Sequence, residues 1–418
     1  MDILRIATAG SIDDGKSTLI GRLLYDTGSV PLDRVEAARA AGRRRGATEL
    51  DLSLFTDGLI AEREQGITID VAHVYFNTAR RKYIAADTPG HVEYTRNMVT
   101  GASAAAAAIV LVDVRAGLVE QTYRHCFIAG LLRIPTLVVA VNKMDLVGWD
   151  RAAFEMVAND IARLTADVRP GLPAPSVVPV SALHGDNVAR RSAHTPWYGG
   201  PTLLEILERA DPRPHRSLRA RFQVQVVLRE GNGERAYAGR VASGMLRVGD
   251  PVVVLPGDRR TTITRIERLG SAVDTALAGD SVSVRIDGVL DLGRGTLLTQ
   301  PDHAPVPRTE VAAQVCWLDE TALDLRKSYA FQHGARVVRA RVARLDGVID
   351  IASQRWRPAA GLSMNDVGRV LVQTSEPVFL DAFAVNPPTG AFILVDEQTH
   401  RTVAGGFVDA DSWHGAAW

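Results

Sequence analysis

Residues 10–17 constrain the fold of this chain more than any other segment. They read GSIDDGKS and fit the pattern G-x-x-x-x-G-K-[ST]. An apolar run at residues 3–9 precedes them and a helical pattern at residues 17–24 follows, which is the strand–loop–helix context that the pattern requires. The sequence therefore predicts a phosphate-binding loop at the end of a buried strand in an α/β sheet.

The residues of this loop suit a bound polyphosphate. Gly10 and Gly15 let backbone N–H groups point inward at phosphate oxygens, and Lys16 adds a positive charge near the β- and γ-phosphates. The Ser17 hydroxyl can ligate Mg²⁺. The loop alone does not distinguish ATP from GTP. We expect the nucleotide to contact Gly10, Ser11, Ile12, Asp13, Asp14, Gly15, Lys16, Ser17 and Thr18.

The first 212 residues repeat the alternation of strand and helix. Further buried strands are expected at residues 81–86, 106–114 and 136–142, and further helices at residues 93–104, 121–132 and 151–164. This alternation predicts a doubly wound, mostly parallel sheet.

The pattern changes after a proline-containing linker at residues 211–214. Segments such as RFQVQVVL alternate apolar and polar residues with period two, and glycine turns separate the expected strands. The sequence therefore predicts two all-β barrel domains behind the α/β domain. We expect a nucleotide-binding domain at residues 1–212, a first barrel at residues 216–305 and a second barrel at residues 308–410.

A second motif, DTPGH at residues 87–91, follows the expected strand RKYIAA. An acid at a strand end suits a water-mediated contact to Mg²⁺, which is the role expected of Asp87, and Gly90 can turn its N–H toward a γ-phosphate. His91 is the candidate for orienting the attacking water. Taken alone, the pentapeptide also fits an ordinary turn between a strand and a helix.

A third motif, NKMD at residues 142–145, selects the base. The Asp145 carboxylate can accept hydrogen bonds from both N1–H and the exocyclic amine of guanine, whereas adenine offers no such donor pair. Asn142 can bind the purine edge, and the stem of Lys143 can lie over the ring. Backbone N–H groups of the later SAL segment, formed by Ser181, Ala182 and Leu183, can reach guanine O6. The motifs together predict GTP and GDP as ligands.

The segment EREQGITID, residues 62–70, has the composition of a switch loop. Thr68 would complete the Mg²⁺ shell only when a γ-phosphate is present, so the loop would order with GTP and loosen after hydrolysis. The alternative is that this segment is an ordinary loop that leads into a strand. A segment can be both a switch loop and the start of a strand. We expect catalysis to depend on Lys16, Thr68 and His91, and Mg²⁺ to bind Ser17, Thr68 and Asp87.

Composition excludes several classes of protein. The 418 residues carry 48 basic and 48 acidic side chains, so no net positive charge draws the chain to nucleic acid or to an anionic membrane. No apolar run is long enough for a membrane span, and the N-terminal apolar stretch is too short for a signal peptide. The two cysteines give no disulfide framework. These features favour a cytoplasmic location.

The ordered motifs, followed by two β-barrels, resemble the translation-factor class of GTPases and are similar to elongation factors Tu and 1-alpha. Within that class, stretches in all three domains resemble the GTPase subunit of bacterial sulfate adenylyltransferase. Those stretches are GSIDDGKSTLIGRLLYD, FTDGLIAEREQGITIDVAHVYF, DTPGHVEYTRNMVTGAS, QTYRH, VNKMDLV, WYGGPTLLEILE, LPGD and TGAFILVDEQTHRTVAGG.

The resemblance implies an energy-coupling GTPase. It would form a heterodimer or a larger assembly with a smaller catalytic subunit that makes adenosine 5′-phosphosulfate and pyrophosphate from ATP and sulfate. GTP hydrolysis would drive or gate that strongly uphill reaction. The resemblance also implies an apolar gate of Ile12 and Ile67 around His91. The chain departs from the family pattern at Val92-Glu93 and at Pro387-Pro388.

Two alternatives share the same motifs. A translational GTPase that delivers aminoacyl-tRNA or acts on the ribosome has the same nucleotide site, although the double acid at residues 13–14 and the WYGGPTLL stretch favour sulfate activation. A nucleotide-binding switch with negligible catalysis would keep its activity in a His91→Ala variant. Loss of GTP turnover with retention of GTP binding in that variant would exclude such a switch.

Overall fold

The structure is a computed structural model that describes residues 2–44, 50–55, 72–87, 95–212, 219–229, 234–351 and 353–410. The chain forms two compact units, one of residues 1–212 with the short segment 351–354 and one of the remaining residues. The expected Mg²⁺ and catalytic residues Thr68 and His91, together with Gly90, lie outside the described residues.

A six-stranded sheet forms the centre of the first unit, with the strand order β2-β3-β1-β4-β5-β6. Neighbouring strands are parallel except for β2, which is antiparallel to β3. The expected mostly parallel sheet is confirmed. Its strands are β1 (Ile3–Ala9), β2 (Ala72–Asn77), β3 (Lys82–Asp87), β4 (Ala107–Asp113), β5 (Thr136–Asn142) and β6 (Ser176–Pro179).

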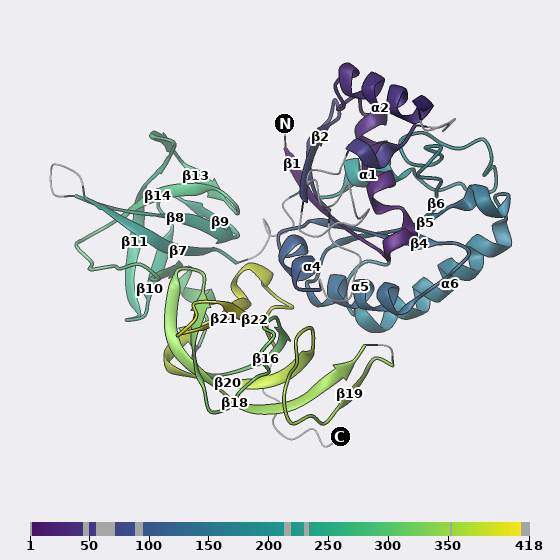
Figure 1. Cartoon of the computed structure of the whole chain (residues 1–418). Helices are drawn as coiled ribbons and strands as arrows, with labels where there is room; N and C mark the ends of the chain where they lie inside the picture. Colours follow the sequence, from purple (N-terminus) through teal and green to yellow (C-terminus); the bar gives the residue numbers. More distant parts are fainter. Residues whose placement is uncertain are drawn as a thin grey trace. The chain divides into compact units, whose positions relative to one another are not determined.

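Helices cover both faces of this sheet because its central strands are apolar on both sides. Leucines and isoleucines of α1 and α7 share one core cluster with β1, β4 and β5, while α4, α5 and α6 lie together along another side in Figure 1. The helices are α1 (Lys16–Asp26), α2 (Leu32–Arg44), α4 (Thr95–Ala102), α5 (Glu120–Leu131), α6 (Arg151–Val168) and α7 (Leu203–Arg209). Within the described ranges, no helix combines the length and hydrophobicity needed to cross a bilayer.

Two of these helices, α2 and α7, were not among those expected from the sequence. The start of α7 nevertheless has a recognisable local signal. Thr202 accepts a hydrogen bond from the Glu205 N–H (3.2 Å), and the Glu205 carboxylate accepts one from the Thr202 N–H (2.9 Å). This reciprocal capping satisfies two N–H groups that a helix leaves unpaired at its start.

The second unit contains two closed antiparallel sheets, each with its own apolar core. In the first barrel β10 pairs with β11, and in the second β17 pairs with β18, so each sheet returns to itself and closes. The first barrel has β7 (Arg221–Arg229), β8 (Arg235–Ser243), β9 (Met245–Arg247), β10 (Pro251–Leu255), β11 (Arg259–Arg268), β12 (Ser271–Val273), β13 (Thr275–Leu277), β14 (Ser281–Ile286) and β15 (Leu297–Thr299). The second has β16 (Pro307–Trp317), β17 (Ser328–His333), β18 (Arg336–Asp350), β19 (Arg355–Arg357), β20 (Val367–Phe379), β21 (Ala391–Asp396) and β22 (Thr402–Val408).

A buried ion pair joins the two barrels. Arg221 at the start of β7 has no exposed surface, and its guanidinium donates to both carboxylate oxygens of Asp381 at 2.7 and 2.9 Å. A third hydrogen bond from Arg221 reaches Thr299 (2.6 Å). Asp381 also accepts hydrogen bonds from Thr389 (2.6 Å) and Asn386 (3.1 Å), so both charges are fully surrounded by partners.

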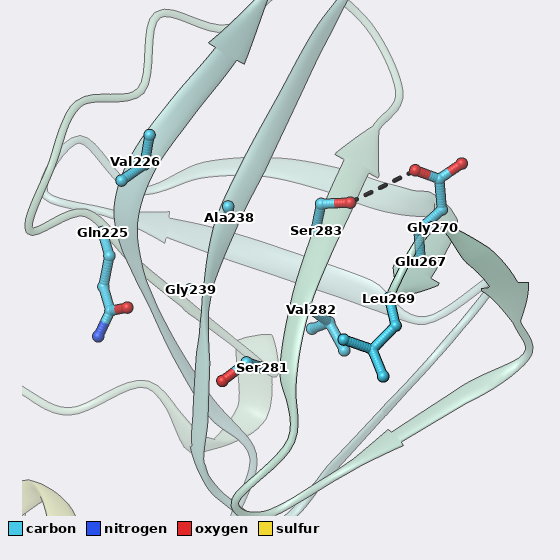
Figure 2. Close-up of a pocket in the computed structure, with 10 residues that line it drawn as sticks. All are labelled: Gln225, Val226, Ala238, Gly239, Glu267, Leu269, Gly270, Ser281, Val282 and Ser283. Carbon is cyan, nitrogen blue, oxygen red and sulfur yellow. Dashed lines mark hydrogen bonds between the residues drawn. The ribbon is translucent and has the colours of Figure 1, made fainter.

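A hollow of about 290 Å³ lies on the first barrel (Figure 2). Strands β7, β8 and β14 and the turn after β11 form it, and its lining includes Leu269, which is 99% exposed. Ser283 donates a weak hydrogen bond of 3.5 Å to Glu267 at its rim. The hollow contains none of the residues expected to bind the nucleotide.

We predict that Asp381→Ala destabilises the barrels strongly. The substitution leaves the Arg221 guanidinium buried without a counter-charge, which costs about 3–5 kcal/mol. The measurement is the free energy of unfolding from urea titration. Asp291→Ala removes the partner of Arg235 from an exposed ion pair, which we expect to change stability by about 1 kcal/mol or less. Similar losses for both variants would contradict the assignment of Arg221 and Asp381 as the joint between the barrels.

Candidate nucleotide site

The phosphate loop connects β1 to α1 at the centre of the sheet. The chain leaves β1 through Gly10, makes one short 3-10 turn at Ile12–Asp14, and enters α1 through Gly15 in a left-handed conformation (φ 92°). Only glycine adopts that conformation without strain. A side chain at position 15 would also stand 2.6 Å from the Asn142 amide nitrogen, so the loop and the base-binding segment are packed against each other here.

Lys16 is buried within the loop, as its expected role requires. The side chain is 5% exposed, and its ammonium donates to the carbonyl oxygens of Gly10 (2.8 Å) and Ser11 (2.7 Å). Burial lowers the pKa of Lys16, and the nearby carboxylates of Asp87 and Asp14 oppose that shift. The third N–H of the ammonium can serve a phosphate oxygen.

Asp14, the second of two adjacent acids in the phosphate loop, stabilises the conformation of the loop. The Asp14 carboxylate accepts a hydrogen bond from the Ser11 N–H (2.5 Å), so it closes the short turn from the inside. Burial raises the pKa of Asp14, while the Ser11 N–H and the Lys16 charge act in the opposite direction. Asp13, by contrast, is exposed.

Asp87 ends β3 beside the phosphate loop. It pairs in register with Thr8 of β1, whose hydroxyl donates to the Asp87 carboxylate (3.1 Å). Thr8 is therefore a positioning residue that the sequence reasoning missed, because its role depends on the pairing of two strands about 80 residues apart. Together with Ser17, Asp87 supplies oxygen donors of the kind Mg²⁺ prefers. The described part of the chain contains no cluster of three or more His, Cys, Asp or Glu suited to a metal ion.

Asn142 joins the loop to the base-binding segments. Its amide nitrogen donates to the Asp14 carbonyl (2.7 Å), and its amide oxygen accepts from the Ala182 N–H (2.9 Å). The expected contact of this side chain with the purine edge stays a prediction, because the amide nitrogen carries two N–H groups and donates one of them to the Asp14 carbonyl. The predicted contacts of Ser181, Ala182 and Leu183 with guanine O6 stay predictions.

The base segment follows β5 through a left-handed residue, Lys143 (φ 65°), and a 3-10 turn that contains Asp145. The Lys143 ammonium lies 2.9 Å from Asp113, a buried acid at the end of β4. Burial works against ionisation of Asp113, but hydrogen bonds from Arg115 and Lys143 outweigh it and hold the pKa of that carboxyl well below its usual range. This ion pair fixes the Lys143 stem, and the sequence reasoning did not identify Asp113 or Arg115.

The 181–183 segment is tied to α1 by Arg22. The Arg22 guanidinium donates to the carbonyl oxygens of Ala182 (3.2 Å) and Leu183. On the other side of the segment, His184 lies 3.9 Å from the Asp145 carboxylate. The two expected base-binding segments, NKMD and SAL, and the phosphate loop are thus brought together at the carboxyl ends of the parallel strands, where open α/β sheets bind ligands.

Comparisons with known proteins agree with this geometry. Residues 1–213 match the model of the elongation factor Tu GTP binding domain, and residues 310–409 match the GTP-eEF1A C-terminal domain-like model. Sulfate adenylyltransferase subunit 1 of Shewanella oneidensis is 44% identical over 96% of this chain and 84% of its own length. The chain belongs to the sulfate adenylyltransferase subunit 1 family.

Other members of this family are equally similar. Sulfate adenylyltransferase subunit 1 of Citrobacter koseri is 43% identical over 99% of this chain and 88% of its own length. The bifunctional enzyme CysN/CysC of Mycobacterium tuberculosis is 48% identical over 98% of this chain, which spans 67% of that longer protein. The chain is thus a guanine-nucleotide-binding GTPase with the elongation-factor-like fold of a GTPase domain and two barrels.

We predict that Gly15→Ala weakens the binding of both GDP and GTP by about tenfold or more in this subunit 1 homologue. The added methyl group would displace the Asn142 amide and strain a left-handed residue. Gly28→Ala is the matched control, because Gly28 is also left-handed (φ 68°) but faces open space. Titration with a fluorescent guanine nucleotide measures both variants. Wild-type affinity in both variants would contradict the prediction, since neither the Asn142 contact nor the strain at Gly15 would then affect nucleotide binding.

We predict that Asp145→Asn changes the base preference of the site from guanine to xanthine. Xanthine has a carbonyl at C2 where guanine has an amine, so an amide side chain complements xanthine and opposes guanine. We expect GTP affinity to fall by about 100-fold and XTP affinity to rise. Competition binding with GTP, XTP and ATP provides the measurement, and Asp160→Asn on the exposed face of α6 provides the control. An unchanged preference for GTP would contradict the assignment of Asp145 as the residue that recognises the base.

Proposed function

We propose that this chain is the GTP-hydrolysing subunit of a sulfate adenylyltransferase. Its GTP hydrolysis drives the synthesis of adenosine 5′-phosphosulfate and pyrophosphate from ATP and sulfate by a smaller catalytic subunit, with which it forms a heterodimer or a larger assembly in the cytoplasm. The observation that carries the proposal is the identity of 44% with a sulfate adenylyltransferase subunit 1 of which the chain covers 84%.

The site geometry supports GTP as the energy source. Asp145 supplies the guanine-selective carboxylate, and Asn142 holds it in a fixed relation to the phosphate loop. Lys16 is held by two loop carbonyls and has an N–H left for the phosphates. Because the site selects guanine, it does not bind ATP. We therefore assign the binding of ATP and sulfate to the partner subunit.

Mg²⁺ fits the donors at the end of β3 and the start of α1. Ser17 and Asp87 would hold it, with Thr68 added when GTP is bound, and the ion would neutralise charge on the β- and γ-phosphates. The chain's own contribution is to orient Asp87 through Thr8 and to keep Lys16 at the phosphates. We assign the orientation of the attacking water to His91 and catalytic roles to Lys16 and Thr68.

The experiment combines the purified chain with the catalytic subunit from the same source, ATP, sulfate and Mg²⁺, and follows GTP hydrolysis and pyrophosphate release together. We predict that each activity rises in the presence of the other subunit. With Asp145→Asn both activities should collapse by about 100-fold with GTP and recover with XTP, because the variant keeps its phosphate loop intact.

The XTP arm separates a lost nucleotide site from a damaged protein. Recovery of both activities with XTP means that one nucleotide site controls both reactions. Pyrophosphate release that is the same for the wild type and the variant, with GTP and with XTP, would contradict the coupling of GTP hydrolysis to adenylyl transfer. Stimulation of GTP hydrolysis by ribosomes or charged tRNA, with no response to the catalytic subunit, would replace the proposal with the translational alternative.

A further inference from the structure

The last residue of strand β4 is a buried acid, Asp113, whose carboxylate contacts two basic side chains. Asp113 is 7% exposed, and the Lys143 ammonium lies 2.9 Å from one of its oxygens. Arg115 donates to both oxygens, from Nε at 3.0 Å and from Nη2 at 2.6 Å. The backbone N–H of Arg115 adds a hydrogen bond of 3.0 Å. Charged donors on both oxygens hold a carboxylate in one orientation.

The pairing of two parallel strands places this acid beside the base segment. Asp113 is in register with Asn142, the last residue of β5, and the Val114 N–H donates to the Asn142 carbonyl (3.1 Å). Lys143 comes next in the chain and is left-handed (φ 65°). On the other side, the Gly117 N–H donates to the Asp113 carbonyl (3.0 Å). Backbone contacts therefore fix the positions of both members of the ion pair.

The contact with Asp113 orders a side chain that is otherwise expensive to order. A lysine loses several freely rotating bonds when its ammonium is fixed, which costs free energy. The Lys143 side chain is 23% exposed, and its ammonium is held by a group of the protein itself. The contact therefore does not need a nucleotide. Ordering a binding side chain in advance raises affinity, because binding no longer includes that cost.

Arg115 makes this ordering effective. Its planar guanidinium takes both carboxylate oxygens at once and so fixes the plane of the Asp113 carboxylate, which a single ammonium does not do. Burial alone would raise the pKa of Asp113, but the hydrogen bonds from Arg115 and Lys143 outweigh burial and hold that pKa below its usual range. The carboxylate is therefore charged at neutral pH.

We propose that Asp113 and Arg115 are positioning residues for base binding and that they act by ordering the Lys143 side chain. Arg115 fixes the Asp113 carboxylate, and the carboxylate fixes the ammonium of Lys143, whose stem is then ready to lie over the base. The proposal rests on the proposed assignment of the NKMD segment to the base. It assigns a contribution to nucleotide affinity to two residues that need not touch the nucleotide.

This contribution is independent of the identity of the base. The apolar stem of Lys143 would lie on the face of the ring, whereas Asp145 recognises the edge. Guanine and xanthine differ at the edge and have similar faces. Loss of the ordering contact should therefore weaken the binding of both bases by the same factor.

A double-mutant cycle provides the test. Asp113→Asn keeps the shape of the side chain and removes its charge, and Lys143→Met keeps an unbranched apolar stem and removes the ammonium. We expect Asp113→Asn to weaken GDP binding by about tenfold in the wild-type chain and by less than about twofold in the Lys143→Met chain, which has no ammonium to order. Titration with a fluorescent GDP measures all four proteins.

A second variant tests the proposal from the surface. The Arg115 side chain is 51% exposed, so Arg115→Ala leaves no buried cavity and still tests the proposal if Asp113→Asn does not fold. We expect a loss of about threefold in the wild-type chain and none in the Lys143→Met chain. The matched control is Arg151→Ala, which removes an exposed arginine that pairs with Glu155 on α6 (2.7 Å) and should leave GDP affinity unchanged. Thermal unfolding checks each variant.

Two results of the cycle would overturn the proposal. An equal effect of Asp113→Asn in both chains, including no effect in either, would mean that Asp113 does not act through Lys143. Tighter GDP binding by Asp113→Asn would mean that Asp113 keeps the ammonium away from the nucleotide.

The Asp145→Asn chain distinguishes this proposal from the assignment of the base site. If that chain prefers xanthine, the base site stands whichever result the cycle gives, and Asp113→Asn should weaken its binding of the xanthine diphosphate by about tenfold as well. An unchanged preference for guanine would contradict the base site, and this proposal with it. The proposed role in sulfate activation is tested separately through the catalytic subunit.

Discussion

The nucleotide site depends on two hydrogen bonds made by the side-chain amide of Asn142. Asn142 is the last residue of the buried strand β5, and its amide bridges the Asp14 carbonyl and the Ala182 N–H. One side chain therefore holds the phosphate loop, the base segment and the 181–183 segment together. A bridge of this kind fixes the distance between the place where phosphates bind and the place where the base is recognised. Because Asn142 is 3% exposed, water does not compete with either hydrogen bond.

The charged side chains around this bridge lie near side chains of opposite charge. Lys143 and Arg115 neutralise Asp113, and Lys16 lies near Asp87 and Asp14. Each of these acids or bases would be costly to bury alone. The carboxylates near Lys16 oppose the effect of burial on its pKa, and Thr8 orients Asp87 beside the loop, so that little reorganisation is needed when phosphates bind. In the barrels, the buried ion pair of Arg221 and Asp381 connects one barrel to the other.

The sequence predicted those parts of the molecule whose structure is determined by residues close together in the chain. The apolar runs at residues 3–9 and 136–142 are the strands β1 and β5, and the glycines and lysine of the phosphate loop lie between a strand and a helix as their spacing required. Contacts made across the fold escaped that reasoning, since the contacts Thr8–Asp87, Arg22–Ala182 and Asp113–Lys143 form only through strand register and helix packing. The roles of Thr68, Gly90 and His91 stay predictions, because these residues lie outside the described part of the chain.

GTP hydrolysis is proposed to drive an unfavourable adenylyl transfer. The most direct test is the final ratio of adenosine 5′-phosphosulfate and pyrophosphate to ATP and sulfate that the two subunits reach together. With GTP this ratio should exceed the equilibrium value measured with the catalytic subunit alone, and with a non-hydrolysable GTP analogue it should not. The same final ratio with both nucleotides would contradict the claim, since a nucleotide that only activates the partner changes the rate of approach and not the end point.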